Sequence, residues 1–245
     1  MKFLWIGALL AASVTAEAGW FDRGTNVDVS EQLSKLFGAN TAFTATAQVS
    51  VTGRVGQNKQ AAEIEYAYLD GKMRAEINMA KTKAGQKHAE AMDQMAMMGM
   101  DRMVNLIVPD KKKAYVIYPG LRSYCEMPTT TPTGQAGTPP TVTRKELGRE
   151  MVEGHPSIKT LVTITEANGQ KYEVTSWEAT DLNNFPVKCE LQQGGDTVVT
   201  IFKNIKLDKP AVSLFEVPAN FKQYSSIDEM MMGAVQQMKI GRAHV

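Results

Sequence analysis

The stretch AEIEYAYLDGKMRAEINM, residues 62–79, decides the fold class of this 245-residue chain. Apolar side chains alternate with polar ones in both of its arms, at Ile64, Tyr66 and Tyr68 and then at Met73, Ala75, Ile77 and Met79. A period of two indicates strands with one buried and one wet face. Asp70-Gly71 between the arms is typical of a two-residue type I′ turn. The stretch therefore predicts a β-hairpin with one apolar face.

Similar alternation recurs along the chain, beginning with FTATAQVSV at residues 43–51. Short turns between successive strands favour an antiparallel meander. Helical patterns cover residues 28–37, 86–98 and 226–238, and these are the elements available to cover an apolar sheet face. We therefore expect an α+β fold, an antiparallel β half-barrel of about ten strands in a meander. Its concave apolar face is covered by two or three helices.

Both ends of the chain read differently from the middle. Residues 1–18 have a positive Lys2, an apolar run and the small-residue pattern Ala16-Glu17-Ala18, which together predict a cleaved signal peptide. The run is too short for a comfortable membrane span, and no cysteine stands at the cleavage site. Residues 240–245 (IGRAHV) match the translation of a common sequencing adapter, and we interpret them as read-through. We expect a periplasmic protein without a lipid anchor or a transmembrane segment, with one domain over 19–239 and a mobile Thr/Pro/Gly loop at 128–143.

Composition and motifs exclude several function classes. The formal net charge is +1, so a nucleic-acid partner is not expected. The sequence contains no G-x-S-x-G, H-E-x-x-H or phosphate-binding glycine loop, and His155 in EGHPS is typical of a hydrogen-bonded turn histidine. We therefore predict that the protein is not an enzyme and needs no cofactor. Cys125 and Cys189 form either a disulfide, as an oxidising compartment favours, or two buried thiols.

Three segments, in this order, resemble a known superfamily. They are LSKLFGANTAFTATAQV (33–49), MVNLIVPDKKKAYVIYPGLRSYCEMP (103–128) and the C-terminal region DLNNFPVKCELQQGGDTVVTIFKNIKLDKPAVSLFEVPANFKQY (181–224). Together they are similar to the LolA, LolB and LppX-like periplasmic lipoprotein carriers, and most similar to an uncharacterised methionine-rich branch of that superfamily. The resemblance implies an incomplete antiparallel barrel that holds acyl chains against its concave face. Fold alone does not fix function.

The binding site for a hydrophobic ligand would be lined by the apolar side chains of the strands and by those of the methionine-rich helix. The predicted lining residues are Phe43, Val49, Tyr66, Tyr68, Met73, Ile77, Leu106, Ile117, Met92, Met95 and Met98. Methionine is unbranched and polarisable, so a methionine surface adapts to ligands of variable shape. We therefore predict an exported carrier or binder of a lipid or a lipoprotein acyl chain, with other envelope proteins as further partners.

The same helix, HAEAMDQMAMMGMDRM at residues 88–103, supports two alternatives. His88, Met92 and Met95 follow one another at i, i+4 and i+7 with Met98 nearby, and thioether sulfur suits Cu(I). Met230–Met232 could add donors if the C-terminal helix lies close. The spacing is also that of any buried helix face. In that case the sheet and helices simply pack together, and the protein is a structural or protein-interaction module of the envelope.

Overall fold

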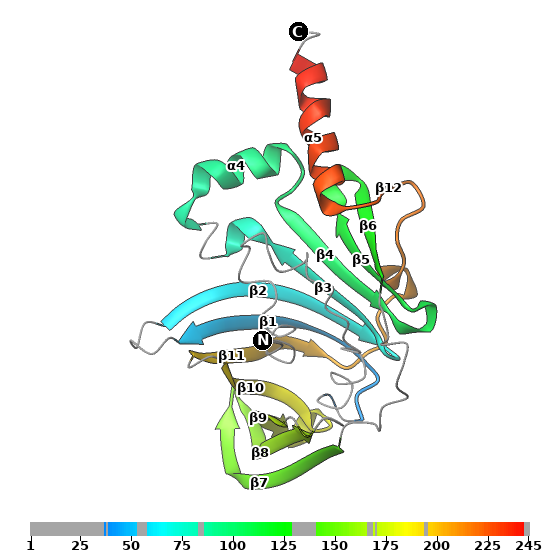
Figure 1. Ribbon diagram of the computed structural model, residues 1–245. Coiled ribbons are helices and arrows are strands. Elements are labelled where there is room, and N and C mark those ends of the chain that lie inside the picture. The colour runs from blue at the N-terminus through cyan, green and yellow to red at the C-terminus, as the bar shows by residue number, and fades with distance from the viewer. Residues whose placement is uncertain are drawn as a thin grey trace.

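In the computed structural model the protein folds around one large curled β-sheet (Figure 1). The structure describes residues 37, 39–52, 58–82, 86–128, 141–165, 169, 171–193 and 196–242. Within these residues the sheet has twelve strands, which are β1 (Ala42–Thr52), β2 (Asn58–Leu69), β3 (Lys72–Asn78), β4 (Arg102–Val108), β5 (Lys113–Tyr118), β6 (Ser123–Pro128), β7 (Thr141–Val152), β8 (His155–Thr165), β9 (Lys171–Ala179), β10 (Phe185–Gln193), β11 (Asp196–Lys206) and β12 (Lys222–Tyr224). The described helices are α4 (Ala89–Met97) and α5 (Ile227–Arg242), with short 3-10 turns η1 (Met79–Lys81), η2 (Pro109–Lys111), η3 (Pro119–Leu121), η4 (Thr180–Leu182) and η5 (Val212–Phe215).

The sheet consists of two meanders joined side by side. Strands β1 to β6 pair in sequence order, as do β7 to β11, and an antiparallel pairing of β1 with β11 joins the two sets. β12 adds to the outer edge of β6 in parallel orientation, with Tyr224 opposite Cys125. The α+β half-barrel prediction is confirmed in its open, curled sheet. The expected count of about ten strands is wrong, because twelve are found among the described residues.

Two of the twelve strands, β7 and β12, lack the apolar alternation on which the expected count rests. β7 has the sequence TVTRKELGREMV and is exposed along most of its length, so backbone pairing with β8 holds it rather than burial. β12 has only three residues. β6 includes Pro128 and β7 begins at Thr141, so both ends of the predicted mobile loop at 128–143 overlap strands. Residues 129–140 lie outside the described residues.

The hairpin at residues 62–79 is confirmed. Asp70 and Gly71 both have left-handed backbone conformations, with φ of 48° and 88°, as a type I′ turn requires. β2 and β3 then pair antiparallel, with Ile64 opposite Ile77 and Tyr66 opposite Ala75. This register places the apolar residues of both arms on one face of the sheet.

That face, which we call the inner face, is the one toward which the sheet curls. Phe43 on β1 and Phe185 on β10 have ring centroids 4.9 Å apart, although β11 lies between their strands. Neighbouring strands are about 4.8 Å apart, so strands two steps apart bring rings this close only when the sheet bends toward them. The inner face carries the larger of two apolar clusters, which extends from β1 to β6 and from β8 to β11.

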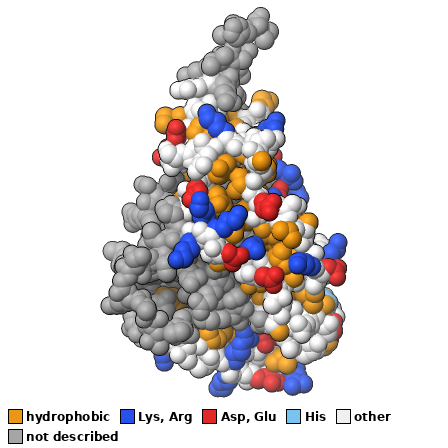
Figure 2. All heavy atoms as spheres, turned by 90° about the vertical axis from the view of Figure 1, so that its right-hand side faces the viewer, with side chains coloured by type: hydrophobic (Ala, Val, Ile, Leu, Met, Phe, Trp, Pro, Cys, Tyr) orange, Lys and Arg blue, Asp and Glu red, His pale blue; other side chains and the backbone are white. Residues whose placement is uncertain are grey.

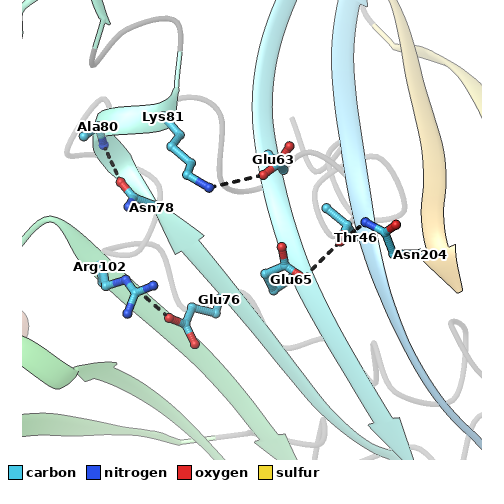
Figure 3. Close-up of polar contacts among 9 residues, drawn as sticks. All are labelled: Thr46, Glu63, Glu65, Glu76, Asn78, Ala80, Lys81, Arg102 and Asn204. Carbon is cyan, nitrogen blue, oxygen red and sulfur yellow. Dashed lines mark hydrogen bonds and ion pairs between the residues drawn. The ribbon is translucent and has the colours of Figure 1, made fainter. Parts of the chain in front are cut away.

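The opposite, outer face carries ion pairs and hydrogen bonds along β1 to β4 (Figure 3). Lys81 Nζ lies 3.5 Å from Glu63 Oε1, and Arg102 Nε lies 3.7 Å from Glu76 Oε1. Thr46 Oγ1 donates to Glu65 Oε2 over 3.1 Å. The ion-paired side chains are partly or largely exposed, so each ion pair contributes little to the free energy of unfolding. They mark this part of the outer face as solvated.

Another part of the outer face, on β2, β4 and β5, is apolar. A second cluster, the outer cluster, lies here and consists of Ala67, Leu69, Val104, Leu106, Val108, Ile117 and Phe215. Phe215 in η5 covers the strands, and partly buried side chains extend the cluster toward the surface. Figure 2 looks at the molecule from the side of β12, β6 and η5 and shows apolar side chains gathered between charged ones. Strands β4 and β5 are therefore apolar on both faces.

The described helices cover less of the inner face than predicted. α4 has no buried residue, and α5 contributes the buried Met230 and Ala234 among its described side chains. α5 packs on β6 and β12 through its first turns and then projects away from the sheet (Figure 1). The expected helix at 28–37 and the predicted signal peptide at 1–18 lie outside the described residues, apart from Phe37. Within the described part of the chain, no helix is both long and apolar enough to cross a membrane.

Candidate functional site

The inner face is the candidate functional site, and its centre is a group of stacked rings. This group, the aromatic cluster, consists of Phe37, Phe43, Tyr68, Phe185 and Phe202. Phe37 lies over the others, with ring centroids 4.6 Å from Phe43 and 5.6 Å from Phe185. All five side chains are buried. Offset and edge-to-face arrangements at such distances stabilise the pair beyond the area they bury.

A polar contact holds Phe37 in this position. Asn40 is buried, and its Nδ2 donates to the Phe37 carbonyl over 2.9 Å and to the Asn183 carbonyl over 3.2 Å. Asn183 Nδ2 donates in return to Asn40 Oδ1 over 3.2 Å. Asn183 follows η4 and has a φ of 53°. The segment before β1 is thereby attached to the turn between β9 and β10.

Methionines replace the rings on the β3 to β6 side of the inner face. This methionine region consists of Met73, Met79, Met95, Met98, Met100, Met103, Met127, Met230 and Met231. Met73, Met100, Met103 and Met230 are buried, and the other five are partly buried. Tyr118 Oη donates to Met103 Sδ over 3.7 Å. The region therefore combines strand methionines with those of both described helices.

Helix α4 is attached to the sheet at its C-terminal end. Gly99 has a φ of 72°, and a Cβ added there would lie 2.5 Å from the carbonyl carbon of Gly120 in η3. Only glycine permits such a close approach of two backbones. Met100 N–H then donates to the Met95 carbonyl over 2.8 Å. Along the helix itself Met95 and Met98 pack against the inner cluster, whereas Met97 is 81 % exposed.

Six of the predicted lining residues meet on the inner face. All six are buried in its cluster, and they are Phe43, Val49, Tyr66, Tyr68, Met73 and Ile77. Leu106 and Ile117 do not join them and lie in the outer cluster on the opposite face. Because β4 and β5 are apolar on both faces, alternation could not show which residues point inward. Met103 on β4 and Val116 on β5 take the inner positions instead.

The residues of the copper hypothesis lie on the surface of α4 or between it and the sheet. His88 precedes the helix and is exposed, and its side chain does not cap the helix. Met92 is half-exposed, while Met95 and Met98 pack against apolar neighbours. Met230 is buried, Met231 is partly buried and Met232 is exposed. Copper binding here stays a prediction.

Cys125 and Cys189 are both buried, and both are free thiols in the structure. They lie on β6 and β10, and six described strands separate these two in the sheet order, namely β5, β4, β3, β2, β1 and β11. Burial raises the pKa of Cys189 to about 12, with the nearby Ser176 hydroxyl acting in the opposite direction. Burial and the neighbouring Glu229 carboxylate raise the pKa of Cys125 to about 11. Both thiols are therefore protonated at neutral pH.

His155 is the first residue of β8, directly after the turn at Glu153 and Gly154, and its side chain is hydrogen-bonded. Its Nδ1 lies 2.8 Å from Asp181 Oδ2 in η4. His155 lines a pocket beside Glu153 and Lys203, whose Oε2 and Nζ atoms are 3.5 Å apart. Within the described residues, no group of three or more His, Cys, Asp or Glu side chains could hold a metal ion. Asn204, which also lines the pocket, donates from Nδ2 to Thr46 Oγ1 over 3.3 Å.

Several inner-face residues were not predicted as lining. Phe185 and Phe202 are the central rings of the aromatic cluster, and Met100, Met103 and Met127 belong to the methionine region. The alternation of β10 and β11 contains the signal for Phe185 and Phe202. Met100 follows the helix in an irregular segment, and sequence periodicity does not place such a residue.

Of the comparisons with known proteins, only the one with solved structures finds matches. No family model matches the chain, and no curated protein does. The lipoprotein LppX of Mycobacterium tuberculosis is 12% identical, with 74% of this chain and 92% of that chain covered and a TM-score of 0.37. A LolA superfamily protein of Nitrosomonas europaea is 8% identical, with 76% and 94% covered and a TM-score of 0.35. LprF of Mycobacterium bovis is 11% identical, with 81% and 100% covered and a TM-score of 0.37. A LolA superfamily structure and LppX are thus among the solved structures that match the chain.

Proposed function

We propose that the protein is a non-enzymatic, exported carrier or binder of a hydrophobic ligand such as a lipid or a lipoprotein acyl chain. The ligand lies against the inner face, on its methionine side, with α4 as a movable cover. The observation that carries this proposal is the packing of α4. The helix spans nine residues, has no buried residue and packs through Met95 and the following Met98 against the larger of the two described apolar clusters.

A cover of this kind suits a ligand better than a fixed core does. Met95 and Met98 are only partly buried, so lifting α4 breaks few apolar contacts. The Gly99 and Gly120 contact keeps one end of the helix attached while the other moves. Unbranched methionine side chains then adapt to the ligand without the strain that a rigid core would impose.

The energetics favour an alkyl chain as the ligand. Each buried methylene contributes on the order of 0.8 kcal/mol. A chain of about a dozen methylenes therefore offsets the several kcal/mol lost when two molecules associate. The sheet itself need not change, because its strands stay paired while the cover moves.

The direct test is lipid extraction from the purified mature protein, followed by mass spectrometry and titration of the delipidated protein with a fluorescent fatty acid. We expect a co-purifying lipid and saturable binding. Absence of both would overturn the proposal.

Variants of α4 locate the binding surface. We expect Met95→Glu combined with Met98→Glu to weaken binding of the fluorescent fatty acid at least about tenfold, because it places carboxylates against an apolar ligand. Met97→Glu is the matched control, since Met97 belongs to the same helix and is largely exposed. Equal effects of the double variant and the control would show that the ligand does not lie under α4.

A further inference from the structure

Strand β7 forms one edge of the large sheet, and among the described residues only β8 pairs with it (Figure 1). The strand at the opposite edge, β12, has only three residues. Most side chains of β7 are exposed, including the apolar Leu147 and Met151 at 47 % and 64 %. A long edge strand presents a row of unpaired N–H and C=O groups to which another strand can bind. Among the described edges, β7 is therefore the one suited to pairing with a second chain.

A β-bulge divides β7 into two halves. Its register with β8 shifts between Glu146 and Gly148, so Leu147 is an extra residue in the strand. In a regular strand, residues three positions apart point to opposite faces of the sheet. Here Arg149 Nε lies 3.0 Å from Glu146 Oε1, so both side chains lie on the same face. Residues equally distant from the middle of the bulge, between Leu147 and Gly148, therefore share a face.

The charges of β7 are complementary to themselves about the middle of the bulge. If two copies of β7 pair antiparallel about this point, Glu146 of each copy lies opposite Arg149 of the other. Lys145 of each copy then lies opposite Glu150 of the other. Both pairs occur twice, because a two-fold axis relates the copies. Opposite charges at directly opposed positions stabilise a pair of antiparallel strands, so this edge attracts a second copy of itself.

Other registers lose this complementarity. A shift by two residues in one direction brings Arg144 opposite Arg149, and two positive charges then repel. A shift by two residues in the other direction leaves no two charged residues of β7 opposite each other. A shift by one residue opposes side chains that point to different faces of the sheet. The charge pattern and the bulge therefore favour the same single register.

The exposed apolar side chains of β7 fit this register as well. Leu147 of one copy lies opposite Gly148 of the other, and a Cβ added to Gly148 would meet no atom within 4 Å. The glycine thus leaves space for the leucine side chain. Met151 lies opposite Arg144, whose aliphatic stem can cover it while the charged end stays in water. Pairing therefore covers apolar surface that the single chain exposes.

We propose that two copies of this chain form a two-fold symmetric dimer by antiparallel pairing of their β7 strands. The two sheets join into one continuous sheet, and both inner faces lie on the same side of it, because opposed residues share a face. Charged side chains on an edge strand commonly keep sheets apart. Here they repel in one shifted register and attract in the register described above. This inference goes beyond the proposed function and does not depend on the ligand.

Analytical ultracentrifugation of the purified mature protein over a range of concentrations tests the dimer. We expect a monomer–dimer equilibrium in the wild type. Glu146→Arg and Arg149→Glu should each weaken dimerisation at least about tenfold, because like charges then oppose each other twice. An equimolar mixture of the two variants should dimerise again, since arginine of one then opposes glutamate of the other at both positions. Glu173→Arg, the same change of charge at an exposed position of β9, is the matched control and should leave the dimer intact.

Crosslinking checks the register with milder substitutions. Chains with Glu146→Cys and chains with Arg149→Cys should form a disulfide between copies when mixed and oxidised, and neither should do so alone. Both positions are largely exposed, at 51 % and 73 %, so these variants should fold. A wild type that stays monomeric would overturn the proposal, and β7 would then be left to solvent or to a strand of another protein. A dimer that survives both charge reversals, or a mixture that neither dimerises nor crosslinks, would overturn the pairing of β7.

Discussion

The aromatic cluster and the methionine region lie on the same inner face and are built in opposite ways. In the aromatic cluster every side chain is buried, and each ring has a neighbouring ring centroid within 6 Å. In the methionine region five of nine side chains are only partly buried, and those of α4 rest on a helix without a buried residue. A rigid anchor and an adaptable surface thus share one sheet.

The same division is visible in the sequence. No phenylalanine occurs between Phe43 and Phe185, while nine of the fifteen methionines lie between Met73 and Met127. Those nine are Met73, Met79, Met92, Met95, Met97, Met98, Met100, Met103 and Met127. Phenylalanine has two side-chain torsions and a flat ring, whereas methionine has three torsions and a polarisable sulfur. The local choice of residue thereby sets how firmly each half of the inner face is packed.

The largest effect should follow from removing a ring. Phe43 contacts Phe37, Tyr68 and Phe185 and is 1 % exposed. We expect Phe43→Ala to lower the free energy of unfolding by about 3–5 kcal/mol, as measured by urea denaturation, because it leaves a large cavity. Met95→Ala in the methionine region should cost less than about 1.5 kcal/mol. Similar costs for the two variants would contradict the division into anchor and adaptable surface.

A smaller effect is expected where α4 is attached to the sheet. Gly99→Ala places a Cβ 2.5 Å from the Gly120 backbone at a φ of 72°, so we expect a loss of about 2–3 kcal/mol of stability. Gly71→Ala separates the two causes, because Gly71 has a φ of 88° with no atom within 4 Å of an added Cβ. It should cost only about 1 kcal/mol from backbone strain. If both variants cost the same, the backbone contact does not hold α4.

The two thiols report on the two halves of the molecule. Cys125 lies on β6 beside α5, and Cys189 lies on β10 in the more firmly packed half. Burial keeps both protonated at pH 8, with pKa values of about 11 and 12, so alkylation requires local opening. We expect mass spectrometry to show Cys125 labelled about tenfold faster than Cys189, which corresponds to about 1.4 kcal/mol of opening free energy.

Two measurements complete the labelling experiment. In denaturant both thiols should react at the same rate, which controls for the reagent. A thiol count in denaturant without reductant should give two free thiols. A count of zero would show that Cys125 and Cys189 form a disulfide. Faster labelling of Cys189 in the native protein would reverse the ranking of the two halves.

Local sequence patterns predict which neighbouring strands pair. They do not predict which apolar side of a strand lies on the inner face, or how an edge strand of the sheet is stabilised. The Asp70-Gly71 hairpin follows from turn chemistry and alternation, and the structure has it. Leu106 lies on the face opposite to Met73 and Ile77, where η5, far along the chain, packs over β4. β7 was missed because its backbone pairing with β8 replaces burial. Both failures depend on contacts between segments distant in sequence.

The smallest effect should come from the methionines of α4 themselves. Met92→Leu combined with Met95→Leu keeps the apolar volume, so we expect the free energy of unfolding to change by less than about 1 kcal/mol. Affinity for the fluorescent fatty acid should stay within about threefold, because half-exposed side chains provide apolar area rather than shape. Titration with Cu(I) against a chromophoric chelator distinguishes the alternative, since leucine supplies no sulfur donor. Tight one-to-one copper binding in the wild type that disappears in this variant would mean that the methionines of α4 bind copper. The partial burial of the helix would then reflect a metal site without its ion rather than a cover for lipid.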